Sequence, residues 1–84
     1  MPSDLREVIV DALRELHFEV SDVTDETPLG DGGLELESLS IAELVMRLDS
    51  FGVEFSDDEM EKLPAMTFGD FTEEVIRRAA AKSA

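Results

Sequence analysis

The stretch from Leu34 to Phe51 constrains the fold most, because the helix that it predicts is apolar around nearly its whole circumference. Two sets of apolar residues recur in it at helical spacing: Leu39, Ala42, Val45 and Met46, and then Ile41, Leu44, Leu48 and Phe51. The helix is predicted to run from about Ser38 to Ser50, with Gly52 after it as a left-handed C-cap. A helix of this composition buries most of its surface and still presents a few apolar side chains to something else.

Residues 4–17 form the first predicted helix, because their apolar positions follow the i, i+3, i+4, i+7 pattern of an amphipathic helix. Asp4 and Glu7 have the spacing of a capping box at its start. His17 is the one histidine of the chain and lies near the end of this helix, where a cation complements the helix dipole. This capping role is favoured over that of a catalytic base.

Two more helices are predicted after Gly52. Ser56 is the expected N-cap of a short helix, with Glu59 completing a capping box, and Pro64 ends this helix after about Lys62. Thr67 is the expected cap of a longer final helix. The apolar stripe of that helix consists of Phe68, Phe71, Val75, Ile76 and Ala79. The cations expected to complement its C-terminus are Arg77, Arg78 and Lys82.

The predicted order is long helix, long loop, long helix, short helix, long helix. We therefore predict an all-α fold, a small four-helix bundle with three longer helices and one short helix. A chain of 84 residues suffices for one domain with one small core, so residues 1–84 are expected to form a single domain. The methionines and phenylalanines are the first candidates for that core: Phe18, Phe51, Phe55, Phe68, Phe71, Met46, Met60 and Met66.

The connection over residues 19–37 is unusually long for so small a domain, and such loops tend to be functional. Its apolar residues are expected to pin it to the core: Phe18, Val20, Val23 and Leu29, joined by Leu34 or Leu36. Its aspartates do not match a calcium-binding EF-hand. A loop counted from Asp31 lacks the required glycine and glutamate, and one counted from Asp22 places Gly33 at the twelfth position.

Acidic residues outnumber basic residues 21 to 7, which gives the chain a net charge of −14. Most of this charge lies in residues 19–61, where 14 acidic residues stand against Arg47 alone. Such a balance disfavours nucleic acid and anionic membranes as partners and favours proteins with basic patches. There is no cysteine for a disulfide or a thiolate metal site, and no apolar run approaches the length of a membrane span. A cytoplasmic monomer is therefore expected.

Ser38 lies in the first turn of the predicted second helix. Free backbone N–H groups and the helix dipole favour a bound anion there, such as a phosphate diester. Serine is also a preferred N-cap, and on the residues alone capping is the favoured interpretation of Ser38.

The residues around Ser38 resemble the Asp-Ser-Leu motif and the second helix of acyl carrier proteins. The motif is matched by Glu37-Ser38-Leu39, and the helix is matched by residues 41–48, Ile-Ala-Glu-Leu-Val-Met-Arg-Leu. Further similarity covers Thr27-Pro28-Leu29, Gly32-Gly33-Leu34 and the residues from Phe51 to Glu59. The resemblance implies the helical fold of that family and a prosthetic group, 4'-phosphopantetheine. A phosphopantetheinyl transferase would take this group from coenzyme A and esterify it to Ser38.

The resemblance further implies a non-catalytic carrier, which holds acyl intermediates as thioesters on the thiol of the cofactor. The partner-docking face would consist of Glu37, Leu39, Glu43 and Met46, although core filling is an equal interpretation for Met46. The implied partners are an acyltransferase or ligase, a ketosynthase and tailoring enzymes with basic docking patches. They would belong to polyketide or fatty-acid-type biosynthesis.

Three residues depart from the family pattern. Glu37 stands where aspartate is usual, which keeps the charge but lengthens the side chain. Glu35 stands where many members have glycine, so a different loop path is expected. Arg47 adds a positive charge to the helix that would face partners, which disfavours some of them.

Two other functions remain open. An aminoacyl or peptidyl carrier of a nonribosomal-peptide-type pathway would also be modified at Ser38, although such carriers are usually less acidic and carry Gly-Gly-His/Asp-Ser-Leu/Ile at the attachment site. An acidic helical adaptor without a prosthetic group would use Ser38 only as a cap. An enzyme has little support, because one histidine, no cysteine and no metal-ligand spacing leave few groups for catalysis.

Overall fold

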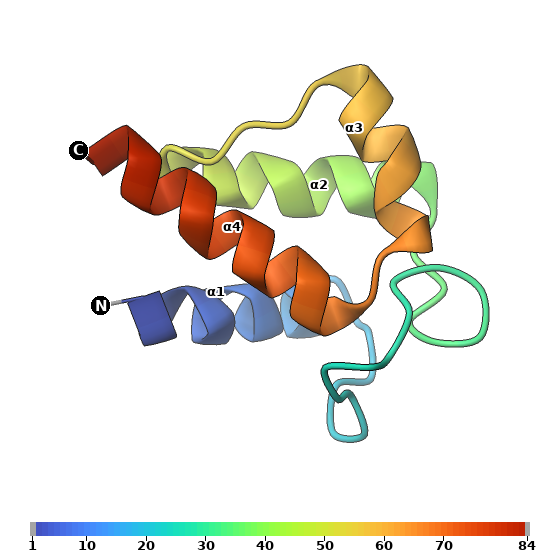
Figure 1. The fold of residues 1–84 in the computed structure, drawn as a ribbon. Coiled ribbons are helices and arrows are strands. Elements are labelled where there is room, and N and C mark those ends of the chain that lie inside the picture. The colour runs from blue at the N-terminus through green and yellow to red at the C-terminus, as the bar shows by residue number, and fades with distance from the viewer. Residues whose placement is uncertain (1, 84) are drawn as a thin grey trace.

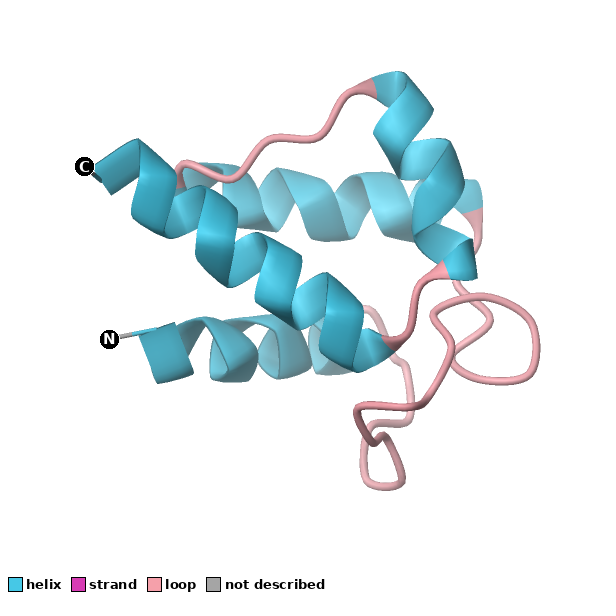
Figure 2. Ribbon diagram, viewed as in Figure 1, coloured by secondary structure: helices cyan, strands magenta, loops and turns pink. Residues whose placement is uncertain are grey.

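The computed structural model describes the backbone of residues 2–83 and the side chains of residues 5–81. Its four α-helices are α1 (Pro2–Glu15), α2 (Ser38–Leu48), α3 (Asp57–Lys62) and α4 (Phe68–Ser83). Two short 3-10 turns, η1 (Asp49–Phe51) and η2 (Leu63–Ala65), follow α2 and α3. Figure 2 shows loops joining these helices, and no named strand occurs among the described residues. The predicted all-α fold with four helices is therefore confirmed.

The axes of helices α1 and α2 lie along similar directions, α4 slants across them, and α3 lies near the start of α2 (Figure 1). Helix α1 packs against both α2 and α4, whereas α3 packs against α2. The connection between α1 and α2 loops out at one end of the bundle, and the start of α1 and the end of α4 lie at the other (Figure 1). Within the described part of the chain, every helix is too short or too polar to span a bilayer.

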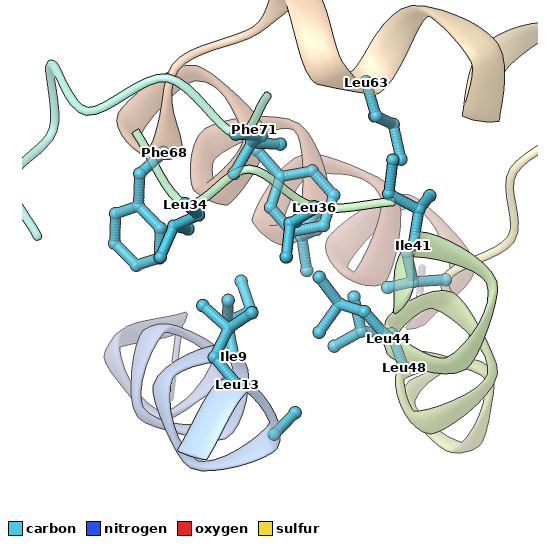
Figure 3. Packing of buried hydrophobic residues seen from close by; sticks show 14 of the residues in the cluster. Ile9, Leu13, Leu34, Leu36, Ile41, Leu44, Leu48, Leu63, Phe68 and Phe71 are labelled. Carbon is cyan, nitrogen blue, oxygen red and sulfur yellow. The ribbon is translucent and has the colours of Figure 1, made fainter. Parts of the chain in front are cut away.

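A hydrophobic core joins the facing sides of α1, α2 and α4 (Figure 3). Its buried residues are Leu5, Ile9, Ala12, Leu13, Leu29, Leu34, Leu36, Ile41, Leu44, Leu48, Val53, Leu63, Phe68, Phe71 and Val75. The stripe predicted for the last helix is thus confirmed, with Ile76 and Ala79 half-buried at its edge. Phe51 was wrongly expected in the core, because its side chain is 44% exposed; for Met46, which is 72% exposed, the alternative interpretation of core filling is wrong. Met46 lies on the side of α2 opposite to the buried stripe, and Phe51 lies in η1, after the end of α2.

The long connection between α1 and α2 is tied to the turn between α3 and α4 by backbone hydrogen bonds. The N–H of Leu29 donates to the carbonyl oxygen of Met66 at 2.9 Å, and the N–H of Gly30 donates to that of Pro64 at 3.1 Å. A Cβ atom at Gly30 would lie 2.7 Å from the Pro64 carbonyl oxygen, so this close approach requires glycine. As expected, the apolar residues of the connection pack on the core: Phe18, Val20, Val23, Leu29, Leu34 and Leu36.

The predicted caps of the two later helices are confirmed. Ser56 Oγ accepts the N–H of Glu59 at 3.2 Å, and Glu59 Oε1 accepts the N–H of Ser56 at 2.9 Å, which completes the capping box of α3. Thr67 Oγ1 accepts the N–H of Asp70 at 3.2 Å at the start of α4. The capping box expected at Asp4 lies outside the described side chains.

Helix α1 ends at Glu15, two residues before the predicted end, in a backbone cap. His17 adopts a left-handed conformation with φ 71°, and its N–H donates to the carbonyl oxygen of Arg14 at 2.9 Å. The N–H of Phe18 reaches back to the carbonyl oxygen of Leu13 at 2.9 Å, which completes a Schellman motif. His17 therefore ends α1 through its left-handed backbone conformation.

Arg78 of α4 connects this helix to α3 and to the loop that precedes α3. Its Nη2 and Nη1 atoms donate to the two carboxylate oxygens of Glu59, the second at 3.2 Å. Its Nη1 also donates to the carbonyl oxygen of Glu54, and its Nε donates to Oε2 of Glu74, both at 2.6 Å. The guanidinium lies 4.3 Å from the ring centroid of Phe55, in the geometry of a cation–π contact. The sequence indicated only a cation near the end of α4, so this tertiary link was missed.

Among the residues that the structure describes, two other than glycine adopt left-handed backbone conformations, His17 with φ 71° and Glu35 with φ 55°. This region costs a residue with a Cβ atom about 1 kcal/mol relative to glycine, so His17→Gly and Glu35→Gly should each raise the free energy of unfolding by about 0.5–1 kcal/mol. Urea denaturation followed by circular dichroism measures the change. Glu7→Gly, at an exposed helical position of α1, is the matched control and should lower stability by about 1 kcal/mol. Equal losses at all three positions would contradict the prediction.

Glu59 makes stability depend on acidic pH. Its pKa is held at about 2, against an ordinary value of 4.5, chiefly because Arg78 donates hydrogen bonds to the carboxylate and secondly because the Ser56 N–H does so. A pKa that is lower in the folded state means that the carboxylate stabilises the fold above pH 4.5, and that this contribution is lost as the pH falls toward about 2.

Glu59→Gln keeps the capping box but removes the charge. The variant should have a lower urea midpoint than the parent at neutral pH, and the difference should narrow below about pH 4.5. A difference that stays constant down to about pH 2 would contradict this assignment.

Candidate functional site

The start of α2 places Ser38 at the first helical position and Glu37 at the N-cap position. Glu37 has an extended backbone, with φ −94° and ψ 169°, and its carbonyl oxygen accepts the N–H of Ile41 at 2.9 Å. No side chain caps this helix end. The interpretation of Ser38 as a side-chain N-cap is therefore wrong, because the capping position is one residue earlier.

The hydroxyl of Ser38 is available for chemistry. The residue is exposed, and its side chain has no hydrogen-bond partner among the described residues. The backbone N–H groups of Ser38, Leu39 and Ser40 also find no acceptor in that part of the chain. They belong to the first turn, whose N–H groups have no partner within a helix and carry the positive end of the helix dipole. The site can therefore stabilise an anion attached to this serine.

A groove of about 800 Å³ separates the start of α2 from α3 and is lined on one side by Ser38. The residues lining it are Leu36, Glu37, Ser38, Ile41, Ala42, Asp57, Met60, Glu61 and Pro64. Its apolar residues are buried or half-buried, whereas its three carboxylates are exposed. The groove can therefore accept an apolar chain beneath an acidic rim. The sequence predicted neither the groove nor its α3 residues, because only the packing of α3 on α2 brings them to Ser38.

Three of the four predicted docking residues, Leu39, Glu43 and Met46, share the outward face of α2. Leu39 and Met46 are 70% and 72% exposed, and Glu43 between them is also exposed. Their spacing of four and then three residues aligns them along one side of the helix. The opposite side carries the buried stripe Ile41, Leu44 and Leu48. Glu37 is exposed just before the helix, where it lines the groove beside Ser38 rather than the face that carries the other three residues.

Arg47 also lies on α2, but its charge is balanced within the protein. Its guanidinium pairs with the carboxylate of Glu15 on α1. Both side chains are substantially exposed, at 41% and 62%, so the pair adds little to stability. It does orient Arg47 toward α1, and this leaves Glu43 as the charged group between the two exposed apolar side chains.

The acidic residues of the described chain do not gather into a metal site. No group of three or more histidine, cysteine, aspartate or glutamate side chains in that part of the protein has a geometry that could hold a metal ion. His17 is exposed at the end of α1 and has no hydrogen bond from its side chain to the described residues.

Comparison with known proteins adds no assignment. The chain matches no protein-family model, no curated protein and no solved structure. The interpretation of the site therefore depends on its own geometry and on the motif around Ser38.

The geometry at the start of α2 predicts different effects on stability for substitutions at two neighbouring residues. Glu37→Asp should raise the free energy of unfolding by about 0.5–1 kcal/mol, because the shorter carboxylate is a preferred N-cap and Glu37 makes no such bond. Ser38→Ala should change it by less than about 0.5 kcal/mol, since this exposed hydroxyl has no partner. Urea denaturation of both variants measures the two changes. A loss of about 1 kcal/mol in Ser38→Ala would mean that Ser38 is the cap after all.

Proposed function

We propose that this protein is an acyl carrier protein, with 4'-phosphopantetheine attached through a phosphodiester to Ser38. The observation that carries the proposal is the free hydroxyl of Ser38, exposed at the first helical position of α2 beside unpaired backbone N–H groups. A serine that caps nothing in a first helical turn has no evident structural task there. The similarity of Glu37-Ser38-Leu39 to the attachment motif of acyl carriers supports the same function.

The charges around Ser38 support the attachment of such a group. The N–H groups of the first turn of α2 favour the negative phosphodiester. Exposed carboxylates at Glu37, Asp57 and Glu61 oppose a second anion close to the groove rim. The phosphopantetheine group would therefore be anchored at Ser38 and otherwise held loosely, as delivery of its cargo to several enzymes requires. When bound, the group supplies a terminal thiol that holds an acyl chain as a thioester.

The groove offers a place for the carried chain. Its lining includes the apolar side chains of Ile41, Ala42 and Met60, next to the attachment serine. Burial of each methylene of an acyl chain contributes about 0.8 kcal/mol, so a chain of several carbons would gain from entering it. The protein itself would bind, orient and shield the cargo, while partner enzymes perform the chemistry.

Docking on these enzymes is assigned to the outward face of α2. Leu39 and Met46 provide exposed apolar contacts, and Glu37 and Glu43 provide negative charge. Basic patches on a phosphopantetheinyl transferase, an acyltransferase or ligase, a ketosynthase and tailoring enzymes would complement this surface. Electrostatic attraction accelerates association without requiring tight binding, which suits a protein that must leave each partner quickly. Polyketide or fatty-acid-type biosynthesis, in the cytoplasm and as a monomer, is the setting that we propose.

The first test is the intact mass after incubation with coenzyme A, magnesium and a broad-specificity phosphopantetheinyl transferase. The parent protein should gain the mass of one phosphopantetheine group, and Ser38→Ala should gain nothing. Ser40→Ala, two residues away in the same turn, is the matched control and should be modified like the parent.

Other outcomes of this test would change the assignment. An increment on Ser38→Ala but not on Ser40→Ala would move the attachment site to Ser40. No increment with several transferases, on protein shown by circular dichroism to be folded, would favour an acidic helical adaptor that uses the exposed face of α2 without a prosthetic group. Loading of aminoacyl rather than acyl groups onto the modified protein would favour an aminoacyl or peptidyl carrier.

The docking face yields a separate prediction. Glu43→Arg should slow transferase-catalysed modification about tenfold by reversing the charge between two exposed apolar side chains, and Leu39→Ala should slow it by removing an apolar contact. Glu73→Arg, an equal charge change at an exposed position of α4, is the matched control and should leave the rate near that of the parent. Steady-state kinetics at low and high salt measure these effects. Equal rates for all variants would contradict the assignment of this face.

A further inference from the structure

In the described part of the chain, helix α3, which forms one wall of the groove beside Ser38, contacts the core only through half-buried Met60 and through Leu63 at its end. It contains six residues, and none of them is buried. Its first turn consists of the acidic residues Asp57, Asp58 and Glu59. A helix of this length has few internal hydrogen bonds, so its position depends on contacts with other elements.

Electrostatic repulsion acts to move this wall away from α2. Glu37 lines the groove on the α2 side, and Asp57 and Glu61 line it on the α3 side. All three are exposed carboxylates, and like charges that face the same groove repel across it. A contact of α3 that opposes this repulsion would therefore determine how far the groove opens.

Arg78 provides such a contact from the far side of α3. It donates to both carboxylate oxygens of Glu59, an arrangement that fixes direction as well as distance. The same guanidinium bonds the carbonyl oxygen of Glu54 and stacks on Phe55. The Phe55 ring in turn stacks on buried Phe71 of α4, with 5.9 Å between ring centroids. Arg78 is thus anchored to the core and attached to α3 at once.

We propose that Arg78 is a positioning residue for the groove: through Glu59 it holds α3 as the wall opposite Ser38 and so sets the opening of the groove. Loss of the Arg78–Glu59 pair should leave the core of α1, α2 and α4 intact while α3 moves away from α2. This inference rests on the geometry of the groove and does not require that Ser38 carries any group.

Amide hydrogen exchange on the full chain tests whether the effect is local. Arg78→Gln should raise exchange of the α3 amides about tenfold, with the buried amides of α1, α2 and α4 little changed. Arg77→Gln is the matched control, because Arg77 lies next in the same helix and pairs with Glu74 but has no hydrogen bond or ion pair to α3 among the described residues. Glu59→Gln should reproduce the effect of Arg78→Gln, since it removes the charge and keeps the capping box.

The position of the wall is measured by spin labels on a pair of introduced cysteines, which are unique because the chain has none. Glu43→Cys on α2 and Asp58→Cys on α3 replace exposed residues. Pulsed electron resonance should give a longer and broader distance distribution when Arg78→Gln or Glu59→Gln is added, and an unchanged one with Arg77→Gln.

Three results would overturn the proposal. One is a rise in exchange that is uniform over all helices, which would make Arg78 a general stabilising residue. Another is faster exchange in α3 with an unchanged distance distribution, which would mean that Arg78 supports the hydrogen bonds of α3 without positioning it. The third is equal behaviour of Arg78→Gln and Arg77→Gln. None of these results bears on the modification of Ser38, so the two proposals fail separately.

Discussion

The apolar contact between α1, α2 and α4 is the interaction on which the rest of this structure depends, because a net charge of −14 opposes collapse of the chain. Full burial of a leucine, isoleucine, valine or phenylalanine side chain contributes about 1.5–3 kcal/mol, whereas an exposed ion pair contributes about 0–1 kcal/mol. Burial of the fifteen apolar core residues in the described part of the chain is therefore the main favourable contribution, and the surface ion pairs add little to it. The stripe Ile41, Leu44 and Leu48 directs one side of α2 into this core, and the other side of that helix is left free for contact with partners.

Arginine side chains pair with carboxylates of other segments at several places in the fold. The acidic middle of the chain has Arg47 as its one basic residue, so its carboxylates take cations from the terminal helices. Arg6 of α1 pairs with Asp25 of the long connection at 2.5 Å, and Arg78 of α4 holds α3. Arg47 pairs in the opposite direction, with a carboxylate of α1. These pairs add little energy singly, but those of Arg6 and Arg78 tie the long connection and α3 to the terminal helices.

The candidate site combines a rigid half and a weakly held half. Ser38 begins a helix whose buried stripe is part of the core, so its hydroxyl is presented from a fixed element. The opposite wall of the groove, α3, has no buried residue and is held by side-chain contacts. In the proposed carrier, the rigid half would present the attachment point in one orientation to every partner. The other half would adapt to the cargo, which explains why one small domain could serve several enzymes.

The sequence by itself determined the features whose interactions lie within a few residues along the chain. Helical spacing predicted the four helices and most of the core, and short-range side-chain bonds predicted the caps at Ser56 and Thr67. Tertiary structure alone decided which side of the nearly uniform helix α2 is exposed, since its apolar pattern pointed in almost every direction. It also decided the groove and the Arg78–Glu59 pair, which joins residues 19 positions apart. Periodicity and capping describe local hydrogen bonds and faces, whereas these contacts arise only when separate helices pack, and no local pattern encodes that packing.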